Sequence, residues 1–425
     1  MSTSTQTNQV IDHLFRHESG KIVAVLTKIF GLTNIEIAED IVQDVLLKAL
    51  ENWKLKGIPQ NPSAWLMLAA KNKTLDFLRH RKLEEKYAKQ ITPLLQSEYT
   101  IGTTLNNYFS ENEIKDDQLR MMFVCCHEAI NEESQIALIL KTLCGFSIPE
   151  IAKAFLTNET NINKRLYRAK EKFRELDIQF EIPSVAEIEN RLDRVLKALY
   201  LLFNEGYNST HNDSLIREDL AAEALRLNII LAQHPSGDIP KTHALLALMY
   251  FHGARFSARL DGKGNILLLK EQDRSLWDSE MIQAGIETLE KASEGNVIST
   301  YHIEAAIACE HCISKSYDST NWHNILNYYD GLLAISPSPL IKLNRAVIIA
   351  EIRGADAALT ELMNIEQELN SYYLLSATRG DLYFQKKDFP TASKMYKQAS
   401  SLTSSPVEKK LLQKKIEQCV LSISQ

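Results

Sequence analysis

The chain has 425 residues, of which 45% are hydrophobic and 24% charged, so its composition is that of a folded globular protein and excludes a disordered one. Its length is typical of about three domains. There is no long apolar run and no apolar signal core, so we expect a cytoplasmic protein, and the six cysteines are few enough to be free thiols. The formal net charge of −6 hides a segregation, because basic residues gather at 71–89 and 164–174 with an acidic stretch between them.

Most of the sequence repeats apolar residues at spacings of three and four, and strand-like alternation is almost absent, so the expected fold class is all-α. Helical patterning begins near Ile11 and is interrupted at 31–34 and 56–63, where the sequence reads GLTN and KGIPQNPS. The stretch 92–112 is polar and weakly periodic, which predicts a linker. Helical patterns resume after it and continue, past a proline-containing break at 180–185, to the C-terminus.

The helix predicted at 38–50 has one apolar and one polar face. Ile41, Val45 and Leu46 can anchor it to the interior. The polar side chains that remain for a partner are Asp40, Gln43, Asp44 and Lys48. The alternative is an amphipathic helix whose acids are only solvated.

The helix predicted at 65–82 is unusual, because five lysines and arginines stand against one acid and two aromatic rings accompany them. At about 100° per residue, Leu66, Ala70 and Phe77 lie roughly opposite a polar edge. Asn and Arg can read base edges, and Trp can stack on an unpaired base. The residues that we expect to contact nucleic acid are Trp65, Asn72, Lys73, Asp76, Arg79 and Arg81. Two alternatives stay open: Asp76 and Arg79 can form an ordinary surface pair, and Trp65 can be a core anchor.

Residues 147–174 have the spacing of a helix-turn-helix. A short amphipathic helix is followed by a turn at 156–159, where Asn158 is placed to cap a second helix. The inner face of that second helix is predicted to consist of Ile162, Leu166, Ala169 and Phe173. The residues free to meet DNA would be Thr160, Asn161, Asn163, Lys164, Arg165 and Arg168. The alternative is a helical hairpin with a solvated charged face.

The last hundred residues repeat with a period of about 34, the distance from Ala346 to Gly380 and from Ala358 to Ala392. Such a period, with small residues where two helices touch, is typical of tetratricopeptide repeats. The expected small and aromatic positions of the last unit are occupied by Gly380, Tyr383, Phe389, Ala392, Tyr396 and Ala399. A generic helical array with an accidental period is the alternative.

Together these segments resemble the sigma-70 family of bacterial RNA polymerase sigma factors, and within it the small extracytoplasmic-function (ECF) group. Residues 38–50, AEDIVQDVLLKAL, look like the helix of region 2 that docks on the polymerase clamp. Residues 61–82 look like the adjoining helix that meets the −10 promoter element, and 116–173 look like region 4, which binds the −35 element. Residues 199–208 and 267–278 resemble the subgroup with a C-terminal tetratricopeptide-like extension.

The resemblance implies sigma region 2 at 10–91, a linker at 92–115, a region 4 helix-turn-helix at 116–180 and a tetratricopeptide-like regulatory extension at 185–425. It implies core RNA polymerase and promoter DNA as partners. The polar residues of 38–50 would then bind polymerase, and the two sets of nucleic-acid candidates would bind the −10 and −35 regions. In the subgroup the extension is thought to regulate the sigma factor in place of a membrane anti-sigma partner. The 34-residue period itself leads us to expect a protein or peptide partner of the array. The alternative function is a polymerase-independent helix-turn-helix regulator with a protein-sensing repeat domain.

No catalytic pattern is found, so we expect neither an enzyme nor a cofactor. The CEHC sequence at 309–312 has metal-like spacing, but it lacks a second ligand pair and falls on a helix core stripe. Residues 261–272 resemble a calcium loop only faintly, because Ile266 stands where glycine is needed and Gln272 replaces the bidentate glutamate, so a turn or short hairpin is expected. A last group of polar and aromatic residues is dense enough to suggest a pocket or a docking surface, but ordinary hydrogen bonding between helices explains it better. The group consists of Glu205, Asp273, Arg274, Trp277 and Asp278.

Overall fold

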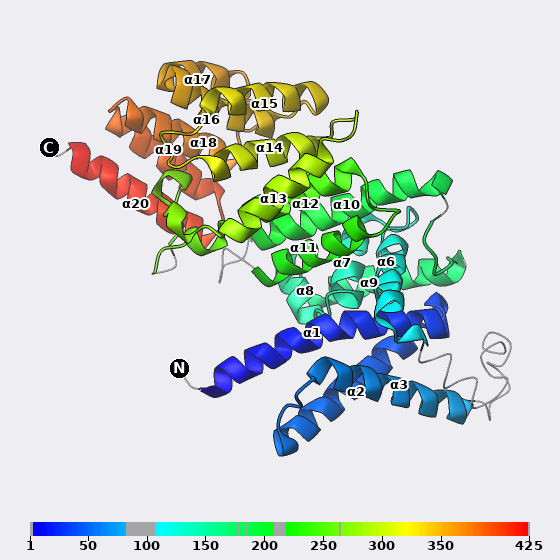
Figure 1. Ribbon diagram of the computed structural model, residues 1–425. Coiled ribbons are helices and arrows are strands. Elements are labelled where there is room, and N and C mark those ends of the chain that lie inside the picture. The colour runs from blue at the N-terminus through cyan, green and yellow to red at the C-terminus, as the bar shows by residue number, and fades with distance from the viewer. Residues whose placement is uncertain are drawn as a thin grey trace. The chain divides into compact units, whose positions relative to one another are not determined.

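The computed structural model describes residues 3–81, 107–155, 157–176, 178–183, 185–207, 218–262 and 265–423. These residues form helices and short connections, with one isolated antiparallel bridge between Leu260 and Ile266. The predicted all-α fold is confirmed, and the bridge lies where a turn or short hairpin was expected. The chain divides into two compact units, unit 1 at residues 1–199 and unit 2 at 200–425 (Figure 1).

Unit 1 is built around its first helix, which packs against the next two and against two helices from beyond residue 107. The helices of this unit are α1 (Thr3–Phe30), α2 (Ile35–Lys56), α3 (Pro62–Arg81), α6 (Glu111–Cys125), α7 (Glu132–Thr142), α8 (Ile148–Ala154), α9 (Glu159–Glu175) and the first part of α10 (Val185–Tyr207). The two predicted interruptions are confirmed at Gly31 and Gly57, whose φ values of 79° and 80° suit glycine.

Helix α6 begins at Glu111, inside the segment 92–115 that the sequence predicts to be a linker. The rest of that segment, up to residue 106, lies outside the described residues. Glu111 and Glu113 stand in the first turn of α6, where carboxylates favour the positive end of the helix dipole. Polar residues in this turn hide the helical period, which explains why the predicted start was several residues late.

A close backbone contact joins α1 to the turn between α7 and α8. A Cβ atom on Gly20 would overlap the carbonyl group of Leu143, and one on Gly145 would overlap the backbone of Arg16. The Arg16 guanidinium also stands 4.9 Å from the centre of the Phe146 ring. The helices that carry the two basic segments, α3 and α9, therefore belong to one compact unit.

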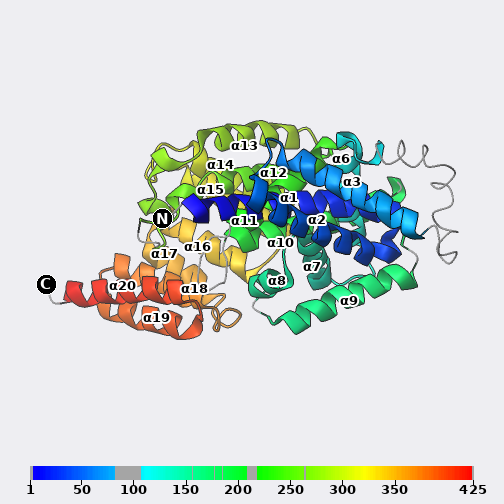
Figure 2. The ribbon, with the colours of Figure 1, turned by 90° about the horizontal axis from the view of Figure 1, so that it is seen from below.

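Unit 2 is a series of helices in which each packs against the next (Figure 2). After the end of α10, its helices are α11 (Glu218–Gln233), α12 (Pro240–Gly253), α13 (Ser279–Ala292), α14 (Thr300–Ile313), α15 (Trp322–Ile335), α16 (Pro339–Arg353), α17 (Ala355–Met363), α18 (Tyr373–Gln385), α19 (Phe389–Leu402) and α20 (Pro406–Ile423). The boundary predicted at 180–185 lies at the start of α10, whereas the compact units part within that helix.

The small residues of the predicted repeat lie at helix contacts inside unit 2. Ala346, Ala358 and Ala392 are fully buried, and a Cβ atom on Gly380 would lie 2.6 Å from the ring of Tyr396. The spacing of α18 and α19 thus depends on a glycine opposite an aromatic ring. The predicted close approach of two helices is confirmed at Gly380, and the three alanines are buried.

The cysteines are free thiols, as predicted. Across the part of the chain that the structure describes, no helix is both long and apolar enough to cross a lipid bilayer.

Candidate nucleic-acid interface

Helix α9 is the second helix of the predicted helix-turn-helix, and its local structure follows the sequence pattern. The Asn158 side chain caps its N-terminus by accepting a hydrogen bond of 2.9 Å from the backbone N–H of Asn161. The predicted inner face is buried at Ile162, Leu166, Ala169 and Phe173. This apolar face fixes the rotation of α9, so the side chains on its other face are directed to solvent.

The solvent-facing side of α9 carries most of the predicted DNA contacts. The exposed candidates are Thr160, Asn161, Asn163, Lys164 and Arg168. A surface hollow of about 430 Å³ lies on this side, and its lining also includes Tyr167. The Tyr167 side chain is 58% exposed, and its hydroxyl donates a hydrogen bond of 2.7 Å to Glu171. An exposed tyrosine between the cations offers a ring and a hydroxyl to a nucleic acid, and the sequence reasoning missed it.

Arg165 differs from the expectation that it is free. Its guanidinium forms an ion pair of 2.6 Å with Glu133 in the first turn of α7, and it stands 6.0 Å from the centre of the Phe155 ring. Because these contacts tie Arg165 to α7 and to the residue that follows α8, its side chain stabilises the packing of α9 against those two helices. Of the six candidates on α9, it is the one that the structure turns toward the protein.

Helix α3 buries one narrow stripe and exposes a polar edge. The stripe, spaced by four residues, consists of Leu66, Ala70, Thr74 and Leu78. The predicted contacts that are exposed on the other side are Asn72, Lys73, Asp76 and Arg79. Asp76 and Arg79 approach to 3.7 Å as a surface pair, so this part of the alternative interpretation is correct. The side chain of Arg81, at the last residue of α3, lies outside the described side chains.

Trp65 is half-buried at the N-terminal end of α3. Its ring packs edge-on against the buried ring of Trp53 on α2, with 5.6 Å between the ring centres. Trp53 in turn lies 5.4 Å from Phe15 on α1. Three aromatic rings from three helices therefore meet there, which gives Trp65 a packing role whatever else it contacts.

The start of α3 is also fixed by a buried acid, Glu18 on α1. Its carboxylate accepts hydrogen bonds from Lys21 at 2.9 Å and from the Ser63 hydroxyl at 3.1 Å. Burial by itself would raise the pKa of Glu18, but the hydrogen bonds from His17 and Lys21 outweigh it and lower the pKa to about 2. The ionised carboxylate thus ties α3 to α1.

The polar face of α2 is exposed as predicted. Its four candidates for a partner are all at the surface: Asp40, Gln43, Asp44 and Lys48. Among them lies Leu47, an apolar side chain that is 59% exposed and that the sequence reasoning missed. An exposed apolar side chain among polar and charged groups fits the usual composition of a protein interface, in which an apolar centre is surrounded by a polar rim.

Ion pairs connect α2 to both basic helices. Lys73 on α3 lies 2.8 Å from Asp44 on α2, so two residues predicted to bind different partners bind each other. Lys170 and Arg174 on α9 pair with Glu39 and Glu36 near the start of α2, at 2.7 Å and 2.8 Å. The acidic side of α2 is thus in contact with cations of α3 and of α9 in this unit.

The polar group of unit 2 does not converge on one pocket. Asp278 caps α13 by accepting from the N–H of Met281 at 3.0 Å, and Asp273 accepts from the N–H of Ser275 at 2.9 Å. The Arg274 guanidinium stacks on Trp277, 4.7 Å from its ring centre. The thiol of Cys312, from the CEHC sequence, is buried and donates to a backbone carbonyl, and the described residues hold no His, Cys, Asp and Glu cluster fit for a metal ion.

Comparison with known families locates three matches along the chain. Residues 14–84 match the family model "Sigma-70 region 2", and residues 120–173 match "Sigma-70, region 4". Residues 191–293 match a family of unknown function, DUF6596. The uncharacterized protein R00370 of Rhizobium meliloti (strain 1021) is 33% identical over 352 residues, which cover 83% of this chain and 82% of that protein. No solved structure matches the chain.

Proposed function

Because this chain belongs to the sigma-70 family, with region 2 and region 4 both present, we propose a division of promoter recognition among its helices. The family places it among the factors that bind core RNA polymerase and promoter DNA for promoter-specific initiation of transcription. The observation that carries the proposal is α9, whose buried apolar face leaves Asn163, Lys164 and Arg168 exposed together on the opposite side.

In this proposal α9 contacts the −35 duplex. Thr160, Asn161 and Asn163 lie on its first turns, where a recognition helix meets base edges in the major groove. Lys164 and Arg168, one helical turn apart, supply phosphate contacts or a bidentate contact to guanine. Arg165 acts differently, since its pair with Glu133 supports the packing of α9.

Helix α3 contacts the melted −10 strand through its exposed edge. Asn72, Lys73 and Arg79 supply hydrogen-bond donors there, and Arg81 continues the basic run. Asp76 holds Arg79 in place rather than touching the strand, since phosphate repels a carboxylate. Trp65 supports this surface from behind by packing on Trp53.

The exposed face of α2 docks on core polymerase. Leu47 is its apolar centre, and Asp40, Gln43, Asp44 and Lys48 form its polar rim. In the unit described here, Asp44 is paired with Lys73. Docking of α2 would therefore compete with that pair and release Lys73 for DNA.

The helices of unit 2 regulate the factor in this proposal, as expected for an ECF sigma factor with a tetratricopeptide-like extension. Support comes from the repeated small residues at the helix contacts of the array. Such a factor works in the cytoplasm, where its polymerase is. The segment matched by DUF6596 covers most of α10 and continues to the end of α13, so the proposed regulatory extension includes it.

The test is transcription by cognate core polymerase on a pool of genomic DNA, with sequencing of the transcript starts. We expect starts that share one pair of upstream elements, and loss of those starts when Lys164 and Arg168 are replaced by alanine. We also expect weak DNA binding by the chain without polymerase. Tight, specific binding of duplex DNA without polymerase, and no new transcript starts, would instead establish the polymerase-independent regulator.

A further inference from the structure

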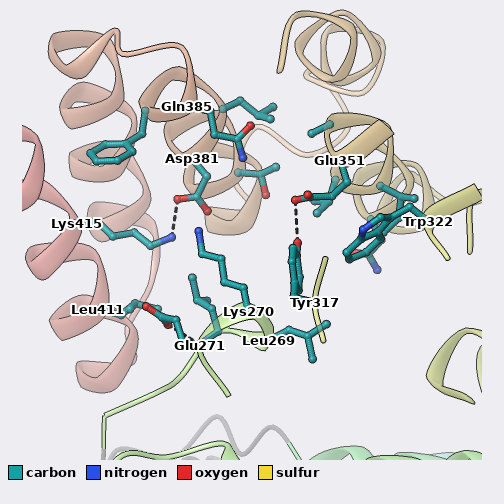
Figure 3. A pocket seen from close by; sticks show the side chains of 18 of the residues that line it. Leu269, Lys270, Glu271, Tyr317, Trp322, Glu351, Asp381, Gln385, Leu411 and Lys415 are labelled. Atoms are coloured by element: carbon teal, nitrogen blue, oxygen red, sulfur yellow. Dashed lines mark hydrogen bonds and ion pairs between the residues drawn. The ribbon is translucent and has the colours of Figure 1, made fainter. Parts of the chain in front are cut away.

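A cavity of about 410 Å³ lies among the helices of unit 2, and Figure 3 shows the side chains that line it. Its helical walls come mainly from α16, α18 and α20, with further residues from α14, α15 and α19, and its size is that of a binding site for a small ligand or a short piece of a chain. Because several helices contribute, the cavity runs across the array rather than along one helix.

One wall comes from a different part of unit 2. Residues 265–278, which we call the arm, connect α12 to α13, and Leu268, Leu269, Lys270 and Glu271 of the arm line the cavity. The arm is ordered by its own hydrogen bonds. The Glu271 carboxylate accepts from the N–H of Leu268 at 2.8 Å, and the N–H of Leu267 donates to the carbonyl of Arg259 at 2.9 Å.

The arm is clamped to the helices behind it by two arginines and a tryptophan. The buried ring of Trp277 lies 5.2 Å from the guanidinium of Arg255 and 4.7 Å from that of Arg274. Arg255 donates to Gln272 at 3.2 Å, and Arg274 donates to the carbonyl of His311 at 2.6 Å, near the end of α14. This clamp holds the arm in one position, so the residues it presents to the cavity are preorganised.

The arm places an unpaired cation in the cavity. Lys270 extends toward Asp381, but no ion pair of Lys270 exists within the described residues (Figure 3). The three acids of the lining are each engaged. Asp381 accepts from Tyr396 and Lys415, each at 2.6 Å, Glu351 accepts from Tyr317 at 2.8 Å, and Glu271 accepts from the N–H of Leu268 at 2.8 Å. A second lysine of the lining, on α20, is Lys414, for which the described chain likewise supplies no ion pair.

The remaining polar groups suit a polypeptide backbone. Asn344 on α16, Gln385 on α18 and Gln418 on α20 line the cavity, and none of these amides is hydrogen-bonded within the described chain. Each amide has one donor side and one acceptor side, as a peptide unit has. Packed helices stand about 8–10 Å apart, and α18 lies between α16 and α20 in the lining, so the three amides are spread over at least about 16–20 Å. An extended segment of about six residues covers that distance, which a small acid does not.

We propose that this cavity binds an extended peptide segment with an acidic side chain, whose carboxylate pairs with Lys270 of the arm and with Lys414. The amides of α16, α18 and α20 bind its backbone, and the half-exposed Val347 and Leu269 contact its apolar side chains. The inference rests on the proposed function in one respect: the peptide would be the ligand of the extension that we propose to be regulatory. The partner would be a protein that offers such an acidic segment.

The experiment is affinity selection of a displayed library of random heptapeptides on the immobilised full-length chain, followed by fluorescence anisotropy with the enriched peptides. We expect peptides with one or two Asp or Glu residues among apolar ones. Lys270→Ala and Lys414→Ala should each weaken binding about threefold to fivefold, and more in combination. Lys270→Arg should bind as the unchanged chain does. The matched control is Lys397→Ala, on the exposed side of α19 and outside the cavity.

Two results would overturn the proposal. One is a selection with no acidic preference, or with the same preference on the chain that lacks Lys270 and Lys414. The other is binding of the acidic peptides by the exposed cations of α9 instead of the cavity. In that case the double substitution Lys164→Ala and Arg168→Ala would abolish peptide binding, and Lys270→Ala would leave it unchanged. Since neither polymerase nor DNA is present, failure here leaves the transcription test unaffected, and failure of that test leaves this result standing.

Discussion

Lys170 on α9 and Glu39 on α2 form an ion pair of 2.7 Å in which the side chains are only 12% and 14% exposed. The pair joins the helix that we propose to read duplex DNA to the helix that we propose to dock on polymerase. Arg174 and Glu36 continue the same contact at its more exposed edge. The two regions of the sigma factor are therefore held together partly by polar contacts that charge changes can weaken selectively.

Reversing one charge of this pair should destabilise unit 1. We expect Glu39→Lys or Lys170→Glu to lower the free energy of unfolding by about 1–3 kcal/mol, because each leaves a shielded charge beside a like charge. The double exchange should recover part of that loss. Denaturant unfolding of the four proteins in a mutant cycle measures this. The exposed Arg174–Glu36 pair is the control and should couple by less than about 1 kcal/mol; strictly additive effects at Lys170 and Glu39 would contradict the shielded pair.

Alanine substitution of Lys164 or Arg168 should weaken promoter binding by the polymerase holoenzyme. We expect a loss of about 1–3 kcal/mol for a base contact, or a salt dependence reduced by about one phosphate contact for a backbone contact. Binding measured at several salt concentrations separates these two cases. Lys172→Ala serves as control, because Lys172 lies near the end of α9 and pairs with Glu175 at 2.6 Å. An equal loss from that control would mean that only overall charge matters.

Replacement of Leu47 by aspartate should weaken the complex with core polymerase at least about tenfold, since it places a charge at the centre of the docking face. The free energy of unfolding should barely change, because Leu47 is 59% exposed. Titration of labelled protein with core polymerase gives the affinity. Leu421→Asp, at an equally exposed leucine of α20, should leave the affinity as it is. Normal polymerase binding by the Leu47 variant would remove α2 from the proposed contact.

Trp65→Ala should cost about 2–3 kcal/mol of stability, because it removes one ring of the Phe15, Trp53 and Trp65 cluster. Trp65→Phe keeps a ring against Trp53 and should cost less than about 1.5 kcal/mol. Thermal unfolding distinguishes the two variants. An unchanged melting temperature for Trp65→Ala, together with lost binding of a single-stranded −10 oligonucleotide by holoenzyme, would assign Trp65 to base stacking instead.

Unit 2 should lose stability as the pH falls below about 6.5. Burial first, and then Arg255 and Arg259, lower the pKa of His252 to about 3, while burial, Arg255 and Arg274 lower that of His311 to about 4. Below their ordinary pKa of 6.5, both histidines bind protons in the unfolded chain but not in the folded one, so protonation favours unfolding until the folded pKa values are reached. Melting temperatures between pH 7.5 and about 5 should show this slope, and His252→Leu should reduce it. A slope unchanged by that substitution would contradict the prediction.

The orientation of α9 could be predicted from sequence because it depends on one period. Ile162, Leu166 and Phe173 recur at helical spacing, and Asn158 precedes them at a capping position. The same period could have found the two residues that were missed. Tyr167 follows Lys164 by three residues, and Leu47 follows Asp44 by three, so each lies on the exposed face already assigned to its helix.

Contacts between distant segments could not be predicted in this way. The partner of Arg165 is Glu133 and the partner of Lys170 is Glu39, and nothing in the local pattern of α9 distinguishes these cations from Lys164 or Arg168. The arm gives a similar example, since its sequence contains Arg274 and Trp277 but not Arg255, which completes the clamp from the end of α12. Such pairs depend on how the helices pack against one another, and this packing cannot be predicted from the local pattern of a single sequence.

The glycine at position 380 makes the chemistry of the cavity that we propose to bind a peptide sensitive to a residue outside its lining. Tyr396 fills the space that a side chain on Gly380 would occupy, and its hydroxyl also donates to Asp381 on the cavity wall. The substitution Gly380→Ala would therefore displace the Tyr396 ring and move its hydroxyl away from Asp381. The Asp381 carboxylate would then keep only its bond from Lys415. A substitution at this buried position would therefore change the polar lining of the proposed site without replacing any residue of that lining.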